Sequence, residues 1–249
     1  MTYAKGSIAL LFTMPLPYFF DANISSKAST YILDELSSKH CIQVLRMQVS
    51  DTLMITNGQG YSFEAVITAA HKKNTQVKIV KEIYQQPTQP QCTIAIAPIK
   101  NASRWEWFLE KATELGIHTI IPIITERTEK QYNKLERQQN IIVAAMLQSQ
   151  QVWLPKLIEP ISFKMLWQQA LPEQRFIAHC ATGDKQPLQK IINATKNTLI
   201  LIGPEGDFTT NEIDIAQQHQ CIAVSLGQNR LRTETAGIFA ATAFQLIAQ

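Results

Sequence analysis

The amino-acid sequence predicts a small, mainly antiparallel β domain followed by a larger α/β domain built on a parallel sheet. Strand-like segments joined by polar turns dominate residues 18–84, and strands alternate with helices from residue 92 onward. Between these regions, residues 85–91 place two prolines among glutamines. Because such a segment can neither continue a helix nor occupy a central strand, we interpret it as the linker between two domains.

The first domain is predicted to cover residues 14–86. Its β-prone segments are residues 52–57, 61–70 and 75–83, with turn signals at 57–60 and 71–74. A helix is expected at Ala28–Ser38, lying across a small barrel or sandwich. Residues 1–13 precede a second methionine, Met14, and we expect them to be an extension without a structural role.

The second domain is predicted to cover residues 92–249. Continuous apolar runs, typical of parallel strands buried on both faces, lie at 92–97, 119–124, 175–180, 198–202 and 221–226. Segments with helical spacing or helix-start signals lie at 103–115, 134–151, 187–194, 210–218 and 234–248. This alternation predicts a sheet covered by helices.

Composition and motif content exclude several function classes. The four cysteines form no CxxC pair, which argues against a disulfide framework or zinc site and suits a reducing cytoplasm. The net charge of +3 permits a nucleic-acid partner without requiring one. The sequence contains no GxGxxG, P-loop, HExxH or GxSxG motif and no apolar run of membrane-spanning length, so we expect neither a metal nor a membrane.

Two glycine-containing loops follow predicted strands and are the main candidates for a site. The first, Gly203-Pro204-Glu205-Gly206-Asp207, follows the apolar run 198–202, and Thr209 or Thr210 with Glu212 can cap the next helix. Alone, it is more typical of an ordinary tight strand-to-helix turn than of a binding site. The second loop, from Gly227 to Arg232, also follows an apolar strand, with Thr233 as a candidate N-cap. Ligands of open α/β sheets bind beyond the carboxyl ends of strands, and we expect these loops on neighbouring strands.

Basic and aromatic residues interleave after the first strand of the second domain, in Lys100-Asn101-Ala102-Ser103-Arg104-Trp105-Glu106-Trp107. This mixture favours phosphate contacts and base stacking, although Trp107 and Phe108 suit a protein core equally well. A further polar cluster, Glu126-Arg127-Thr128, ends the next strand. Arg230 and Arg232 are compatible both with ligand binding and with a structural pairing to Glu234.

Taken together, these segments resemble the SPOUT (α/β-knot) methyltransferases, and specifically the RsmE family, which methylates N3 of a uridine in 16S ribosomal RNA. The resemblance extends over nearly the whole chain from Met14. Its most specific pieces are Ile202-Gly203-Pro204-Glu205-Gly206, Leu226-Gly227 and Leu231-Arg232-Thr233-Glu234-Thr235-Ala236. The segments Glu106-Trp107, Glu110–Gly116, Pro122, Glu126-Arg127, Gln148-Ser149 and Pro155 also match, as do His40, Val44-Leu45-Arg46 and Asp51 at the opening of a PUA-like RNA-binding barrel.

The resemblance implies a trefoil knot in the second domain, a homodimer, and S-adenosyl-L-methionine as cofactor. The residues it assigns to the cofactor are Leu201, Ile202, Gly203, Pro204, Glu205, Gly206, Leu226, Gly227, Leu231, Arg232 and Ala236. We expect Arg232 to stabilise charge on the uracil oxygens, with Glu205 or Glu234 orienting it. The residues expected to contact RNA are Arg46, Lys72, Lys73, Lys100, Arg104, Arg127 and Arg230, although Lys72 and Lys73 are equally compatible with a solvated turn.

The sequence departs from the family pattern at several positions. Asp207 stands where a second glycine is usual, Gln151 and Trp153 stand where arginines are common, and Ser50 replaces the glycine before Asp51. Three other interpretations stay open at this point: an RNA-binding ribosome-assembly factor without turnover, a methyltransferase for another rRNA or tRNA site, and an NTP-dependent enzyme using Gly203–Gly206 as a phosphate loop. No lysine follows those glycines, which disfavours the last.

Overall fold

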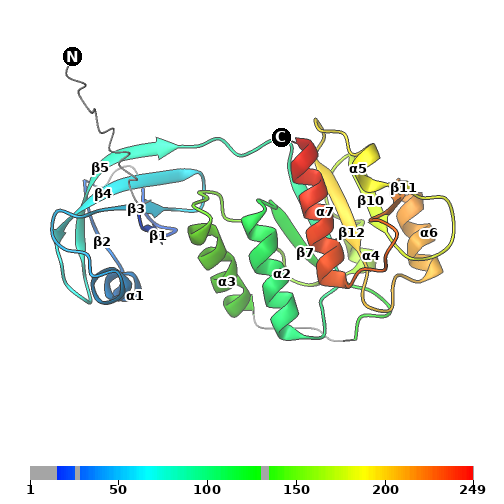
Figure 1. Cartoon of the computed structure of the whole chain (residues 1–249), viewed down its shortest axis with the longest axis horizontal. Helices are drawn as coiled ribbons and strands as arrows, with labels where there is room; N and C mark the ends of the chain where they lie inside the picture. Colours follow the sequence, from blue (N-terminus) through cyan, green and yellow to red (C-terminus); the bar gives the residue numbers. More distant parts are fainter. Residues whose placement is uncertain (1–15, 26–28, 130–134, 249) are drawn as a thin grey trace, which may run out of the picture. The chain divides into compact units, whose positions relative to one another are not determined.

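The computed structural model describes residues 16–25, 29–129 and 135–248. They form two compact units (Figure 1). The first unit holds the chain up to Asn57 together with Ser62–Ile83, and the second holds Gly58–Tyr61 and everything from Tyr84 onward. Residues 1–13, expected to be an extension, lie outside the described residues.

The first unit is built on a five-stranded sheet with strand order β1-β3-β4-β5-β2. Its elements are β1 (Tyr18–Phe20), β2 (Thr30–Ile32), α1 (Glu35–Lys39), the π-helical turn η1 (His40–Val44), β3 (Thr52–Thr56), β4 (Tyr61–Ala69) and β5 (Gln76–Tyr84). Pairing is parallel between β1 and β3 and antiparallel between β3 and β4 and between β2 and β5. Leu53, Ile55 and Phe63 are almost fully buried in its core, as expected for a small β domain.

The helix expected at Ala28–Ser38 is wrong over its first half. Ala28 lies outside the described residues, but Thr30–Ile32 form strand β2, which pairs with β5. The β-branched side chains of Thr30 and Ile32 favour this extended conformation. The helix starts only after Asp34, whose side chain accepts a hydrogen bond from the Ser37 backbone nitrogen at 2.8 Å and so acts as the N-cap.

The second unit is built on an eight-stranded sheet in which all the pairings between described strands are parallel, as its apolar runs predicted. The strand order is β11-β13-β10-β12-β6-β7-β8, and β9 pairs with β7. The strands are β6 (Cys92–Ile96), β7 (Thr119–Ile124), β8 (Lys156–Leu157), β9 (Ile161–Ser162), β10 (Gln174–Ala178), β11 (Gln186–Pro187), β12 (Thr198–Ile202) and β13 (Ile222–Ser225).

Helices cover both faces of this sheet, because successive side chains of each buried strand point to opposite faces. On β12, Ile200 and Ile202 join one apolar cluster and Leu199 and Leu201 the other. The first cluster includes residues of α2 (Ala102–Glu114), α3 (Leu135–Gln148), α5 (Leu188–Ile191) and α7 (Thr233–Ala248). The second includes residues of α4 (Phe163–Leu166) and α6 (Thr210–Gln218). Figure 1 shows α3, α2 and α7 side by side on one face.

The predicted helices of the second unit are confirmed, with two differences in extent. The segment 187–194 forms only the four-residue helix α5, and α3 ends at Gln148 rather than at residue 151. Lys134, the expected start of α3, lies outside the described residues. Among the described residues, no helix has the length and apolar character required to span a bilayer.

Candidate active site

A cavity of about 570 Å³ opens at the carboxyl ends of β10, β12 and β13. It brings together most of the residues expected to bind a ligand: Ile202, Gly203, Pro204, Glu205, Leu226, Gly227, Arg230, Leu231, Arg232 and Ala236. Leu201 and Gly206 are not among its lining residues. Leu201 is buried in the second apolar cluster, on the face of the sheet covered by α4 and α6, and Gly206 is exposed on the surface.

The strand order corrects one expectation about this site. The two glycine loops follow β12 and β13, which are not neighbours, because β10 lies between them and pairs with both. The cavity therefore has a third wall, formed by the end of β10 and the following loop, with Ala178, His179, Cys180 and Lys185. Sequence reasoning predicted the strand but did not consider its end as part of the site.

The β12 loop, Gly203–Asp207, is held by contacts from four other parts of the unit. The hydroxyl of Thr233 donates to the Gly203 carbonyl at 3.0 Å, and Arg127 Nη1 donates to the Gly206 carbonyl at 2.7 Å. The Asp207 carboxylate accepts from the backbone nitrogen of Cys180 at 2.8 Å. Arg230 Nη2 donates to the Glu205 carbonyl at 3.3 Å. These bonds fix the loop's backbone where it faces the cavity.

Gly203 is required by packing. A Cβ atom at this position would lie 3.0 and 3.1 Å from two ring atoms of Phe208, whose side chain is buried beneath the loop. Such an approach is closer than nearly all real Cβ contacts, so a larger residue would displace the aromatic ring or the loop. Helix α6 then starts with the predicted capping box, in which Thr209 and Glu212 satisfy each other's backbone groups.

Asp207 shows why a glycine is usual at its position. Its φ angle is +64°, in the left-handed region that disfavours side chains. The carboxylate offsets this strain, because it accepts from the Phe208 nitrogen at 2.9 Å as well as from Cys180. The side chain thus ties the β12 loop to the end of β10, and it does not cap α6, whose N-cap is Thr209.

The β13 loop, Leu226–Arg232, is more exposed. Gly227 has a φ of +119°, and no atom of the described residues lies within 4 Å of the place that a Cβ would take. Its backbone conformation, rather than crowding, therefore calls for glycine. Arg232 is exposed and lines the cavity, and within the described residues its guanidinium has no hydrogen bond or ion pair. A cation without a protein partner at the mouth of a cavity is free to meet charge on a ligand.

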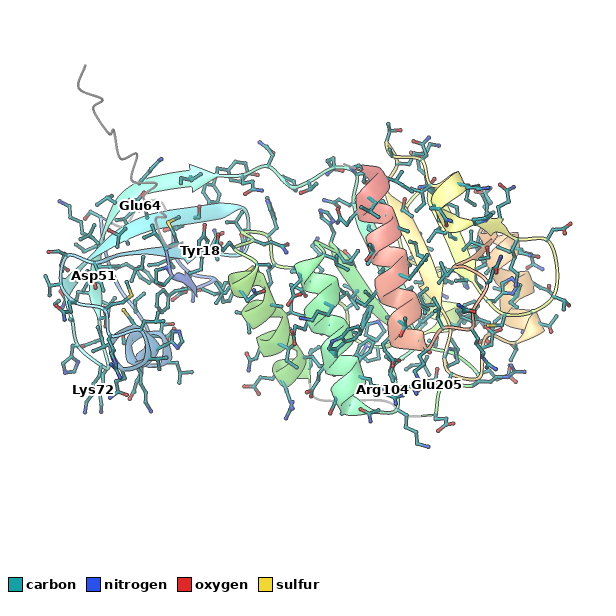
Figure 2. All side chains as sticks on the ribbon, in the orientation of Figure 1. Tyr18, Asp51, Glu64, Lys72, Arg104 and Glu205 are labelled. Atoms are coloured by element: carbon teal, nitrogen blue, oxygen red, sulfur yellow. The ribbon has the colours of Figure 1, made fainter. Side chains whose placement is uncertain are left out.

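Helix α7 begins at Thr233, so Thr233 is the first helical residue rather than the expected N-cap. Its hydroxyl donates a hydrogen bond to the Gly203 carbonyl instead. Glu234 follows in the first turn and is only 7% exposed. Its carboxylate lies 3.7 Å from Arg104 Nε, which identifies Arg104 rather than Arg230 or Arg232 as its cationic partner. Glu234 does not line the cavity, whereas Glu205 does. Figure 2 shows Arg104 and Glu205 at the same end of the unit.

At the end of β10, the charged side chain of Lys185 is hydrogen-bonded to backbone carbonyls, whereas the ring of His179 has no hydrogen-bond partner among the described residues. Lys185 Nζ donates to the carbonyls of His179 and Ala181, at 2.9 and 2.7 Å. Both ring nitrogens of His179 are shielded from solvent and lack a hydrogen-bond partner within the described residues. Burial lowers the pKa of His179, the Lys185 charge lowers it further, and Asp207 raises it in part. The imidazole is therefore neutral at pH 7.

The basic residues expected to contact RNA fall into two groups. In the second unit, Lys100 pairs with Glu129 at 2.7 Å, while Arg104, Arg127 and Arg230 make the contacts described above. In the first unit, Arg46, Lys72 and Lys73 are all exposed, the lysines in the predicted turn before β5 (Figure 2 labels Lys72). No cluster of three or more histidine, cysteine or acidic side chains suited to a metal occurs in the described part of the chain.

Comparison with known proteins identifies both units. Residues 33–80 match the RNA methyltransferase PUA domain family, and residues 86–245 match the RNA methyltransferase domain family. These matches confirm the expected fold class, a PUA-like β domain followed by a SPOUT parallel α/β domain.

Individual relatives agree with these matches. The ribosomal RNA small subunit methyltransferase E of a Synechocystis species is 33% identical, with the match covering 79% of this chain and 67% of the relative. That of Rickettsia conorii is 29% identical over 90% of this chain and 94% of the relative.

Solved structures of similar fold also come from rRNA methyltransferases. A probable rRNA methyltransferase from Porphyromonas gingivalis is 34% identical, with a TM-score of 0.86 over 94% of this chain and 98% of the other. A ribosomal RNA small subunit methyltransferase E from Neisseria gonorrhoeae, solved bound to S-adenosyl methionine, is 27% identical, with a TM-score of 0.83 over 93% and 98% of the two chains. The chain therefore belongs to the ribosomal RNA small subunit methyltransferase E (RsmE) family of RNA methyltransferases.

Proposed function

We propose that this protein transfers a methyl group from S-adenosyl-L-methionine to N3 of a uridine in the 16S rRNA of the small ribosomal subunit. The observation that carries the proposal is the cavity at the ends of β10, β12 and β13, in a chain whose relatives are small-subunit rRNA methyltransferases and include structures bound to S-adenosylmethionine.

The residues of the cavity fit this cofactor in size and charge. A volume of about 570 Å³ suits a small-molecule ligand. Gly203 and Gly227 have no side chains, so they line the cavity with backbone groups alone. Lys185, Glu205 and Asp207 provide charges of both signs, which complement a ligand with a sulfonium, an ammonium and a carboxylate.

Bound S-adenosylmethionine supplies a methyl group on a positively charged sulfur, which keeps the electron pair of the broken bond. Methyl transfer requires an in-line approach, so much of the protein's contribution is positioning. The anchored β12 loop provides one fixed wall for this, and Leu226–Leu231 provide another. Uridine N3 carries a proton at neutral pH and must release it before its lone pair can form the new bond to carbon.

Loss of that proton places negative charge on the uracil oxygens, and Arg232 is the residue that we assign to stabilise it. Its guanidinium is exposed, lines the cavity and has no partner among the described residues, so binding the substrate requires no existing ion pair to break. A positive charge held in place before the reaction lowers the activation barrier most when it lies where negative charge develops in the transition state. Orientation of Arg232 by Glu205 stays a prediction, since Glu205 lines the same cavity but no ion pair joins the two side chains among the described residues. We assign Glu234 to position α7 through Arg104.

The first unit would deliver the RNA. Arg46, Lys72 and Lys73 are exposed, and their positive charges suit phosphate contacts. Neutralising them should flatten the dependence of RNA affinity on salt concentration, because each lost phosphate contact lowers the slope by about one. An unchanged slope would instead assign Lys72 and Lys73 to a solvated turn.

A homodimer acting in the cytoplasm completes the proposal. Three large apolar side chains are exposed on α2 and α7, which cover the same face of the sheet: Trp107 is 44% exposed, Phe239 40% and Leu246 74%. Exposed apolar groups on paired helices favour burial against a second copy. Sedimentation equilibrium of the chain and of a Leu246→Glu variant would test this. The trefoil threading of the two loops stays a prediction.

The central experiment combines cofactor binding with mapping of the methylated nucleotide. Calorimetric titration should show binding of S-adenosylmethionine. Mass mapping of 16S rRNA from cells lacking the gene should reveal one unmethylated uridine, which the purified protein restores to N3-methyluridine on small subunits. Binding without methyl transfer would support an assembly factor without turnover, and methylation of another RNA site would change the substrate.

A further inference from the structure

His179 stands apart from the other polar residues of the cavity because its polar atoms are unused. It follows β10 directly and lines the cavity, yet both ring nitrogens are shielded from solvent with no hydrogen-bond partner among the described residues. Its neighbours differ: Lys185 donates to two backbone carbonyls, and Asp207 accepts from two backbone nitrogens. Buried polar atoms of folded proteins almost always have partners, so an imidazole with neither nitrogen satisfied calls for an explanation.

The surroundings hold the backbone of His179 in place and leave its ring available. Lys185 Nζ donates to the His179 carbonyl at 2.9 Å, and Asp207 holds the next residue, Cys180, by its backbone nitrogen at 2.8 Å. The segment is therefore fixed to the β12 loop on one side and to its own following loop on the other. Because His179 lines the cavity, reorientation of its ring about the side-chain torsions is the movement that would present its nitrogens to a ligand.

The charges around the ring favour its neutral form. Burial and Lys185 both lower the pKa of His179, against a smaller opposing effect of Asp207. Arg230, Arg232 and Glu205 line the same cavity. A neutral imidazole offers one N–H donor and one bare nitrogen acceptor, and it does not repel a cationic sulfonium.

We propose that His179 is a cofactor-binding residue whose ring donates one hydrogen bond to, and accepts another from, polar atoms of S-adenosylmethionine. This inference rests on the proposed function. The cofactor is favoured over the RNA base as the partner because His179 lines the same cavity as Gly203, Leu226 and Gly227, the loop residues assigned to the cofactor. The shielded nitrogens also suit a small ligand that enters the cavity more than a base presented from outside.

His118 provides a matched control within the same unit. Its Nδ1 is also buried without a partner among the described residues, and burial lowers its pKa too. It precedes β7, however, and so lies at the amino end of the parallel sheet, away from the cofactor loops. It lines a separate cavity that contains Gly116 and Trp153. The two histidines therefore share residue type and burial but differ in location, and His118 also has a hydrogen bond to the Thr88 backbone.

The test compares His179→Phe with His118→Phe by calorimetric titration with S-adenosylmethionine and by thermal unfolding without ligand. Phenylalanine keeps an aromatic ring and removes both nitrogens. For His179→Phe we expect the Kd to rise about tenfold, as the loss of two hydrogen bonds implies, with the unliganded Tm unchanged or higher because no bond is lost there. For His118→Phe we expect a Kd within about twofold of the natural chain, because its cavity is separate.

Four results would overturn the inference. A Kd for His179→Phe equal to that of the natural chain would show that the ring does not bind the cofactor. A rise matched by His118→Phe would show a general effect of losing a buried histidine, as would a lowered unliganded Tm for His179→Phe. Failure of the natural chain to bind the cofactor would remove the proposed function itself, and this inference with it.

A conservative variant keeps the inference testable if His179→Phe does not fold. Glutamine retains one donor and one acceptor, so His179→Gln should bind S-adenosylmethionine with a smaller rise in Kd than the phenylalanine variant. Partial rescue of affinity by glutamine supports hydrogen bonding by the ring. If His179→Phe does not fold, His179→Leu removes both nitrogens instead, and a Kd for His179→Leu equal to that of His179→Gln would contradict it.

Discussion

The two glycine loops of the cavity look alike in sequence but differ in how they are held. The β12 loop, Gly203–Asp207, is bonded to Thr233, Arg127 and the end of β10, at 2.7–3.0 Å. The β13 loop, Leu226–Arg232, is joined to it by a longer bond of 3.3 Å between Arg230 and the Glu205 carbonyl. The β12 loop is therefore fixed by hydrogen bonds to the rest of the unit, whereas the β13 loop is largely exposed to solvent.

This difference suits the two loops to two separate tasks in methyl transfer, binding of the cofactor and contact with the incoming substrate. A wall fixed by short hydrogen bonds can hold a small ligand without reorganising when the ligand binds. An exposed loop ending in an arginine without a partner among the described residues can meet a substrate that arrives from outside. We therefore expect changes at the anchors of the β12 loop to alter cofactor affinity and stability. Changes at Arg232 should alter the chemical step.

The largest effect is expected for Arg232→Ala. Removing a cation that stabilises developing charge should lower the single-turnover rate of methylation about 100- to 1000-fold, with cofactor Kd and Tm close to those of the natural chain. The measurement uses small subunits as substrate and saturating cofactor. Arg232→Lys is the control, since it keeps the charge and loses the planar donor pair. A full rate for Arg232→Ala, with normal RNA binding, would exclude the assigned role.

Arg127→Ala should have the next largest effect, on the anchored wall. The variant loses a charge-assisted bond of 2.7 Å to the Gly206 carbonyl, so the β12 loop should loosen and the cofactor Kd rise about fivefold to tenfold. The rate at saturating cofactor should change little. Lys196→Ala serves as a matched control in titrations, because Lys196 pairs with Glu173 on the surface, before β12 and β10 begin, and should leave the Kd unchanged. Equal effects of both variants would contradict the anchoring role.

The sequence predicted the two glycine loops well because each depends on local information. A strand that stops at a glycine, followed by capping residues such as Thr209 and Glu212, indicates a turn and the start of the next helix from neighbouring residues alone. The partners of those loops were not predictable in this way. Arg127 was expected to contact RNA, and the structure shows it bonded to Gly206, 79 residues further along the chain. Such a contact depends on strand order, which local patterns do not specify.

The third wall was missed for the same reason. The segment 175–180 was recognised as a strand, but its end has no glycine turn or familiar motif, and His179 is a single residue without a spacing pattern. Its importance arises because β10 lies between β12 and β13, which places its end in the cavity. The wrong helix at Ala28–Ser38 has a different cause, since pairing with β5 decided the conformation of Thr30–Ile32.

Thr233→Val tests the anchor that comes from α7. The change keeps the shape of the side chain and removes the hydroxyl that donates to the Gly203 carbonyl at 3.0 Å, which leaves a buried acceptor without that partner. We expect the free energy of unfolding to fall by about 1 kcal/mol and the cofactor Kd to rise about threefold. Thr235→Val, at an exposed position of the same helix, controls for the loss of a threonine hydroxyl. Similar losses in both variants would assign the effect to helix propensity instead.

The smallest effect is expected for Arg230→Ala, the direct test of how independent the two loops are. Its bond to the Glu205 carbonyl is long, at 3.3 Å, and exposed, so it should contribute little to stability. We expect the unfolding free energy to change by less than about 0.5 kcal/mol and the cofactor Kd by about twofold or less. Titration and denaturant unfolding beside Arg127→Ala measure both quantities. A Kd increase as large as that of Arg127→Ala would mean that the β13 loop is anchored as firmly as the β12 loop. In that case the division between a fixed cofactor wall and an open catalytic wall would not hold.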